Sequence, residues 1–188
     1  MPLKLIRQNH WEIIGRGPTL LSSPPTIDQS GELYTGRIVE EAALLSKAHA
    51  IIRKDGKYNP DSGIPPDVSS EFEASTKNLV KDLGIKCVLV ILGKNEPGIE
   101  IRTFQDTGPV PTDLINEGLR SDFEVNTTSG EPGKADAPDV QTFALALGPD
   151  ERGFRKELVI SRIADMVGLI NGRLGWSETD ERAGNTLD

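Results

Sequence analysis

The sequence feature that most constrains the fold is an unbroken apolar run at residues 87–92. A strand with one face in water alternates apolar and polar side chains, whereas an unbroken run is typical of a strand covered on both faces. Residues 99–104 do alternate, and residues 93–98 between the two segments have the length and composition of a turn. The pattern therefore predicts an antiparallel hairpin over residues 85–104.

Apolar side chains recur at helical spacing in residues 35–54, 70–83 and 153–174, which predicts three main helices. A shorter helix is expected after Thr112, and residues 140–147 have the composition of a third strand. This order of elements predicts an α+β fold, a small and mainly antiparallel sheet (hairpin 85–104 plus strand 140–147) packed with three main helices.

The chain has 188 residues, which suits one domain. We predict an extended N-terminal arm over residues 1–33, because Pro24 and Pro25 are unsuited to a central strand or a helix interior. A single domain is expected over residues 34–176, with a long irregular insertion at 105–139 that is rich in glycine and proline. Residues 177–188 form a polar, acidic tail.

Composition argues against several classes of protein. The formal net charge of -8 would repel a phosphate backbone, so we expect no nucleic-acid partner. No apolar run approaches the ~20 residues that a membrane-spanning helix needs. The chain has one cysteine and begins without an apolar signal segment. These features predict a cytoplasmic protein, or one assembled into a particle made in the cytoplasm.

Side chains that often perform catalysis are scarce, since the chain has two histidines and one cysteine. His10 and Glu12 match half of the zinc-deaminase signature, but the other half requires two cysteines. We expect His49 on the apolar face of the first helix, buried and hydrogen-bonded to backbone, and Cys87 as a small buried apolar side chain. Neither a metal site nor a cofactor is predicted.

The absence of a catalytic pattern favours a non-enzymatic structural or interaction protein, the subunit of a larger assembly such as a virion or phage particle. Such a subunit would self-associate or join a multi-subunit complex through the apolar anchors of its arm and an exposed edge of its last helix. The candidate contact residues are Trp11, Arg16, Leu20, Leu21, Ile27, Gly168 and Gly172.

Two alternatives remain open. The first is a small enzyme or ligand-binding domain with a carboxylate/histidine site, for which Asp106, Asp113 and His49 are the candidates. A cavity that brings His10 or His49 within hydrogen-bond distance of an acid would favour this interpretation. The second is a regulatory or inhibitor-type partner, because an acidic surface suits a basic target.

Overall fold

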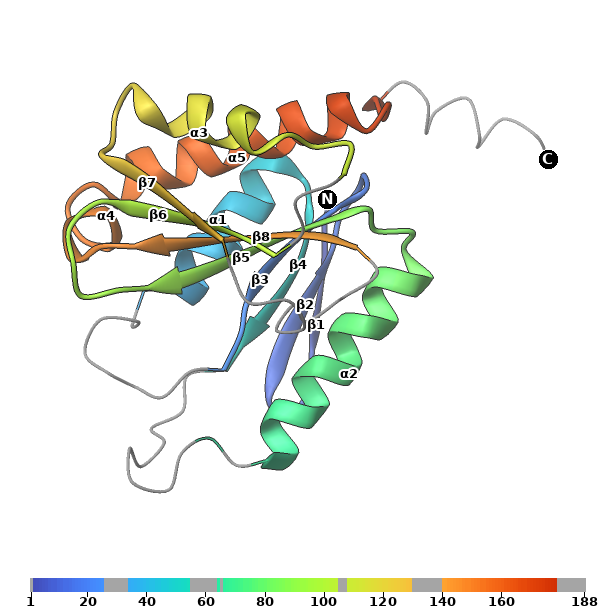
Figure 1. Cartoon of the computed structure of the whole chain (residues 1–188). Helices are drawn as coiled ribbons and strands as arrows, with labels where there is room; N and C mark the ends of the chain where they lie inside the picture. Colours follow the sequence, from blue (N-terminus) through green and yellow to red (C-terminus); the bar gives the residue numbers. More distant parts are fainter. Residues whose placement is uncertain are drawn as a thin grey trace.

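The computed structural model describes residues 2–25, 34–54, 64, 66–104, 108–129 and 140–178. Within these residues the chain forms one eight-stranded sheet and five helices (Figure 1). The strands are β1 (Leu3–Ile6), β2 (His10–Ile14), β3 (Thr19–Ser23), β4 (His49–Arg53), β5 (Cys87–Gly93), β6 (Ile99–Thr103), β7 (Val125–Ser129) and β8 (Gln141–Leu147). The helices are α1 (Thr35–Ser46), α2 (Pro66–Asp82), α3 (Thr112–Arg120), α4 (Pro149–Arg152) and α5 (Lys156–Arg173).

The sheet is mixed, with the strand order β1-β2-β4-β3-β5-β8-β6-β7. Its four central strands, β4, β3, β5 and β8, are parallel, and antiparallel strands flank them on both sides. Parallel neighbours need crossover connections, and α1 and α2 supply them between β3, β4 and β5. The fold is therefore α/β, and the prediction of a small, mainly antiparallel α+β sheet with three main helices is wrong.

The predicted hairpin over residues 85–104 does not form. Strands β5 and β6 exist as expected, but β8 lies between them, parallel to β5 and antiparallel to β6. Because β5 is a central strand, buried on both faces, it needs a neighbour on each side, and β3 and β8 are those neighbours. The turn after β5 resembles a hairpin turn locally. The pairing is nevertheless set by β8, which begins more than forty residues after β5 ends.

The described part of the predicted N-terminal arm is strand. Residues 2–25 contain β1, β2 and β3, and Pro24 and Pro25 follow β3 instead of interrupting it. Leu20 and Leu21 are completely buried because β3 lies between β4 and β5. The arm prediction is therefore wrong here, and Ile27 lies outside the described residues. The division into one domain, an insertion and a tail stays a prediction.

The first predicted helix, residues 35–54, is too long. Helix α1 ends at Ser46, and Lys47 adopts the left-handed conformation (φ 59°) that closes it. Strand β4 follows, and its neighbouring residues Ile51 and Ile52 suit a strand because β-branched side chains fit a pleated sheet. His49 therefore belongs to a strand. The last helix, predicted over residues 153–174, is confirmed as α5.

Helices cover both faces of the sheet: α1, α3 and α5 lie together on one face and α2 crosses the other (Figure 1). From β3 the chain moves sideways to β4 through α1, then returns past β3 to β5 through α2. Open α/β sheets bind ligands at such a reversal, beside the carboxyl ends of the strands. We call the edge at which β3 and β4 end the carboxyl edge.

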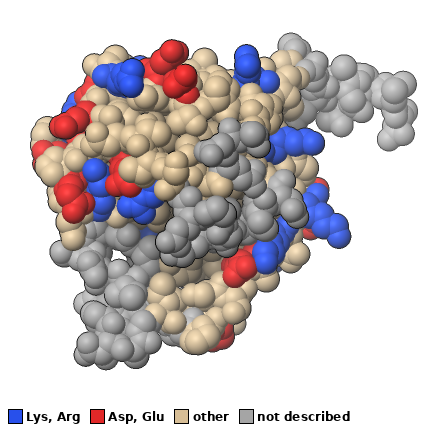
Figure 2. All heavy atoms as spheres, in the orientation of Figure 1, with Lys and Arg blue, Asp and Glu red and all other residues tan. Residues whose placement is uncertain are grey.

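Charges of both signs are interspersed over the described surface that Figure 2 shows, so the excess of acidic residues is not gathered there in one patch. Among the described residues, no helix combines the length and the apolar character that crossing a membrane requires.

Candidate functional site

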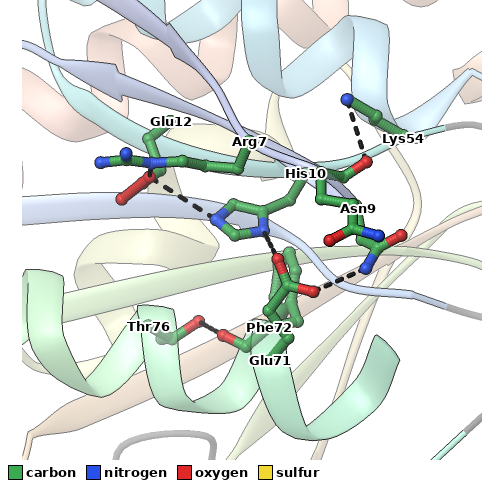
Figure 3. Close-up of polar contacts among 9 residues, drawn as sticks. Arg7, Asn9, His10, Glu12, Lys54, Glu71, Phe72 and Thr76 are labelled. Atoms are coloured by element: carbon green, nitrogen blue, oxygen red, sulfur yellow. Dashed lines mark hydrogen bonds and ion pairs between the residues drawn. The ribbon is translucent and has the colours of Figure 1, made fainter. Parts of the chain in front are cut away.

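A buried histidine lies between two carboxylates at the carboxyl edge. Strand β2 runs antiparallel to β4, so its first residue, His10, lies opposite Arg53, the last residue of β4. His10 is only 2% exposed. Its Nε2 is 3.6 Å from Oε2 of Glu12, and its Nδ1 is 3.5 Å from Oε1 of Glu71 (Figure 3). We call His10, Glu12 and Glu71, with Arg7 and Asn9 beside them, the His10 cluster.

Local structure explains this arrangement. His10 and Glu12 are two residues apart in a strand, so both side chains point to the same face, which α2 covers. Glu71 comes from the first half of α2, and its neighbour Phe72 packs edge-on against the imidazole with ring centroids 6.0 Å apart. Neither nitrogen of His10 has a hydrogen-bond partner among the described residues. Buried polar atoms are rarely unpaired, and such exceptions often mark functional positions.

Each carboxylate of the His10 cluster is held by a second polar group. The Arg7 guanidinium donates to the Glu12 carboxylate, and Asn9 Nδ2 donates to Glu71 Oε2 at 2.6 Å (Figure 3). The backbone N–H of Arg7 also donates to the carbonyl oxygen of His10 at 3.0 Å, which closes the β1–β2 turn. The turn and α2 thus position both acids on opposite sides of one ring.

Burial lowers the pKa of His10 below its ordinary value of 6.5, and the charges of Glu12 and Glu71 offset part of that effect. The imidazole is therefore mostly neutral at pH 7. A neutral imidazole carries one N–H, so one of its nitrogens is then a proton acceptor that faces a carboxylate.

A groove runs from the His10 cluster along the side of α2. Its first part, of about 440 Å³, has Arg7 and Glu12 at one end, and its second part, of about 460 Å³, adjoins His49. The two parts share Ile14, Asp82 and Leu83, so we treat them as one groove, the α2 groove. The first part is lined by Leu5, Arg7, Glu12, Ile14, Ser75, Asn78, Leu79, Asp82 and Leu83.

Arg53 ties the carboxyl edge together. Its Nη1 donates to Ser23 Oγ at 3.2 Å, to the Pro24 carbonyl at 3.0 Å and to Thr35 Oγ1 at 3.2 Å. These contacts join the ends of β3 and β4 to the start of α1. The Arg53 guanidinium therefore gives the edge beside His10 a fixed shape.

His49 has a structural environment at the opposite end of β4. The backbone N–H of Gly15 donates to His49 Nδ1 at 3.0 Å. Burial lowers the pKa of His49, and a hydrogen bond with the Gly17 backbone opposes that shift. The prediction of a buried histidine bonded to backbone is confirmed, although the residue lies in a strand. Cys87 is confirmed as a buried apolar side chain, and burial raises the pKa of its thiol to about 12.

The residues predicted to contact a partner do not meet in one place. Trp11 is half-buried, with Lys4 Nζ 4.3 Å from its ring centroid, and Arg16 is exposed. Gly168 and Gly172 lie on the exposed side of α5, where an added Cβ would meet no atom within 4 Å. Leu20 and Leu21 are in the core of this chain. An interaction role for the exposed residues stays a prediction.

The candidates of the enzyme alternative are also dispersed. Asp113 is exposed at the start of α3, across the sheet from α2, and Asp106 lies outside the described residues. The residues missed by sequence reasoning are Arg7, Asn9 and Glu71. The spacing of His10 and Glu12 could have indicated a shared face once that segment was recognised as a strand, but Glu71 carries no such signal.

The described residues do not fit a zinc site. Catalytic zinc is held by three protein ligands, in sets such as His₃, His₂Glu or Cys₂His. His49 is four residues along β4 from the position opposite His10, or about 13 Å away, and Cys87 is in the core. Glu12 and Glu71 face opposite nitrogens of His10, so a cation on either nitrogen meets one carboxylate. No cluster of three potential ligands occurs among the described residues.

The two histidines make stability depend on pH. Each has a folded-state pKa below 6.5, so below pH 6.5 the unfolded chain binds protons that the folded chain does not. We therefore expect the free energy of unfolding to be constant from pH 8 to 7 and to fall below pH 6.5, by at most about 2.7 kcal/mol per pH unit. Urea unfolding between pH 8 and 5.5 measures this. His49→Gln should reduce the slope, and an unchanged slope would contradict the assignment.

The fold is similar to that of several solved structures, among them hydrolases. No protein-family model and no curated protein sequence matches the chain. A bacteriophage poly-γ-glutamate hydrolase is similar in structure, with a TM-score of 0.53, 9% identity and coverage of 87% of this chain and 88% of that one. The CwlD amidase of Clostridioides difficile has a TM-score of 0.55 at 13% identity, over 84% and 98% of the two chains. The YndL protein, in a zinc-free form, has a TM-score of 0.53 at 12% identity, over 85% and 90%.

At these identities the likeness concerns the fold alone. The shared architecture is one that a poly-γ-glutamate hydrolase and an amidase use, which is consistent with an enzymatic activity. This finding contradicts the predicted role as a non-enzymatic structural subunit or particle component, and it favours the alternative of an enzyme or ligand-binding domain. The chain thus has an α/β fold found in hydrolases.

Proposed function

We propose that this protein is a hydrolase of amide bonds that acts without zinc, with Glu12 as its general base. The observation that carries this proposal is the His10 cluster, in which a buried imidazole backs a carboxylate that lines the α2 groove. The place of Glu12 in the lining of the groove, with the Arg7 guanidinium beside it, supports it. The hydrolase fold supports the reaction class.

The proposed reaction uses residues at the end of the groove. The Glu12 carboxylate takes a proton from a water molecule as the water oxygen bonds to the amide carbonyl carbon. The Arg7 guanidinium, which also lines the groove, stabilises the negative charge that develops on the carbonyl oxygen. The C–N bond then breaks, and the proton passes from Glu12 to the leaving nitrogen, which yields a carboxylic acid and an amine.

His10 acts in this scheme as a positioning residue. It is too buried to touch a substrate, but its Nε2 faces Glu12 and its Nδ1 faces Glu71. A neutral imidazole beside Glu12 can share the proton that the carboxylate receives. Its removal is therefore expected to change the pH dependence of the reaction as well as its rate.

The test is hydrolysis of an amide panel by chelator-treated protein. The panel contains N-acetyl amino acids, a γ-glutamyl oligomer and N-acetylated dipeptide amides, because related folds include a poly-γ-glutamate hydrolase and an amidase. We expect turnover of at least one substrate in EDTA, and Glu12→Gln should lower kcat about 100-fold or more, in the range found for a lost general base.

Two matched variants sharpen this test. His10→Asn is expected to lower kcat and shift the acidic limb of the pH–rate profile, whereas Glu117→Gln, on the exposed side of α3, should leave both unchanged. Circular dichroism and urea unfolding establish that each variant is folded. Activity that EDTA abolishes, full activity in Glu12→Gln, or no turnover of any amide would each contradict the proposal.

A further inference from the structure

We infer that the α2 groove binds an extended amide substrate that carries a cationic group, with Asp82 as the counter-ion. The inference rests on the proposed function in one respect, since it takes Glu12 as the reactive end of the groove. The binding claim itself depends only on the shape and the charges of the groove.

The length of the groove favours an extended ligand. Its first part follows α2 from Ser75 to Asp82, a distance of about 10 Å at the rise of an α-helix. Glu12 and Arg7 lie at one end, and Asp82 lies where the two parts of the groove join. A ligand whose amide carbonyl lies at Glu12 therefore presents to Asp82 a group about 10 Å away, or about three residues of extended chain.

The lining of the groove indicates the chemical class of that ligand. Apolar contact is provided by Leu5, Ile14, Leu79 and Leu83, and the Asn78 side chain can form a hydrogen bond with an amide group of the ligand. The charges of Arg7 and Glu12 are paired with each other, whereas the exposed carboxylate of Asp82 has no ion-pair partner within the described residues.

The charge of the groove is therefore negative. With the net charge of -8 on the whole chain, it disfavours a polyanion and favours an ammonium group, such as a lysine side chain or an amino terminus.

The experiment compares three probes that share one backbone and differ in the charged end of one side chain: Nα-acetyl-lysyl-leucinamide, its neutral norleucyl analogue and its anionic glutamyl analogue. Binding to the full chain is followed by ¹⁵N-resolved NMR titration. We expect shifts confined to the groove, at the amides of Leu5, Ile14, Asn78 and Asp82. The lysyl probe should bind about fivefold more tightly than the norleucyl probe at low salt, and the difference should vanish in 1 M NaCl.

Variants separate the groove from the rest of the surface. Asp82→Asn is expected to remove the preference for the lysyl probe without affecting the norleucyl probe, and Glu117→Gln should change neither. Ser75→Trp, which places a large ring in the groove, should weaken binding of all three probes.

The outcomes also separate this inference from the proposed activity. Equal binding of the lysyl and norleucyl probes, or shifts outside the groove, would overturn the inference even if amides are hydrolysed. Groove shifts with the expected dependence on Asp82 sustain it even if no amide is cleaved, and in that case the proposed hydrolase activity fails while the binding inference stands.

Discussion

Arg152→Met is expected to lower the free energy of unfolding by about 4 kcal/mol, because Arg152 is 4% exposed and its guanidinium joins two segments of backbone through three carbonyl oxygens. Its Nε donates to the Leu147 and Gly148 carbonyls at 3.0 and 3.3 Å, and its Nη2 donates to the Lys94 carbonyl at 2.8 Å. Methionine fills part of the volume but leaves these carbonyl oxygens without their charged donor. Urea unfolding at pH 7.5 measures the loss.

Two further variants test the cause of this loss. Arg152→Lys keeps the charge but cannot reach three carbonyls at once, so an intermediate loss is expected. Arg120→Met, on the exposed end of α3, should change stability by less than about 0.5 kcal/mol. If Arg152→Met and Arg120→Met cost the same, the guanidinium does not hold the ends of β5 and β8 together.

Gly15→Ala is expected to destabilise the protein by about 3 kcal/mol, the upper end of the cost of overpacking. A Cβ at Gly15 would overlap the carbonyl oxygens of Lys47 and Ala48, which are backbone atoms that cannot rotate away. Any movement that relieves the overlap also weakens the hydrogen bond from the Gly15 N–H to His49. The loss is measured by urea unfolding at pH 7.5, where both histidines are mostly neutral.

Gly168→Ala is the matched control, with the opposite expected sign. An added Cβ at Gly168 meets open space on α5, and alanine is preferred over glycine in a helix interior by about 1 kcal/mol. We expect stabilisation of up to that amount. Destabilisation by Gly168→Ala, or a neutral result for Gly15→Ala, would show that the close approach at Gly15 is not what requires glycine there.

Sequence patterns located many of the elements but not their pairing. The apolar run of β5, the strand β8 and the long helix α5 were each predicted close to their observed bounds, since local periodicity reports which faces are buried. Periodicity does not show which strands pair with each other in the sheet. The insertion of β8 between β5 and β6 and the central place of β3 are long-range choices, and they turned an expected antiparallel sheet into a mixed one.

The helix expected over residues 35–54 failed for a different reason. The apolar spacing of α1 continues by coincidence through His49 and Ile52. A prediction from periodicity alone therefore extends the helix beyond the residue at which it ends. The left-handed residue that ends it is a lysine, not the glycine that usually signals such an end.

The candidate site was half visible in the sequence. His10 and Glu12 stand two apart, which in a strand places them on one face. The third member, Glu71, comes from α2. It accepts a hydrogen bond from Asn9, which lies 62 positions away in the chain. Only the crossing of α2 over β2 and β4 brings it there, and the sequence has no local marker of that crossing.

The place of β8 also makes the two ends of the sheet depend on each other. Among the described residues, β6 and β7 are hydrogen-bonded to the remainder of the sheet through β8 alone. The five strands from β1 to β5 and the pair β6–β7 are thus two separate ribbons until β8 joins them. A nascent chain that has emerged as far as β7 has made all of the described strands except β8, and its sheet is still in two pieces.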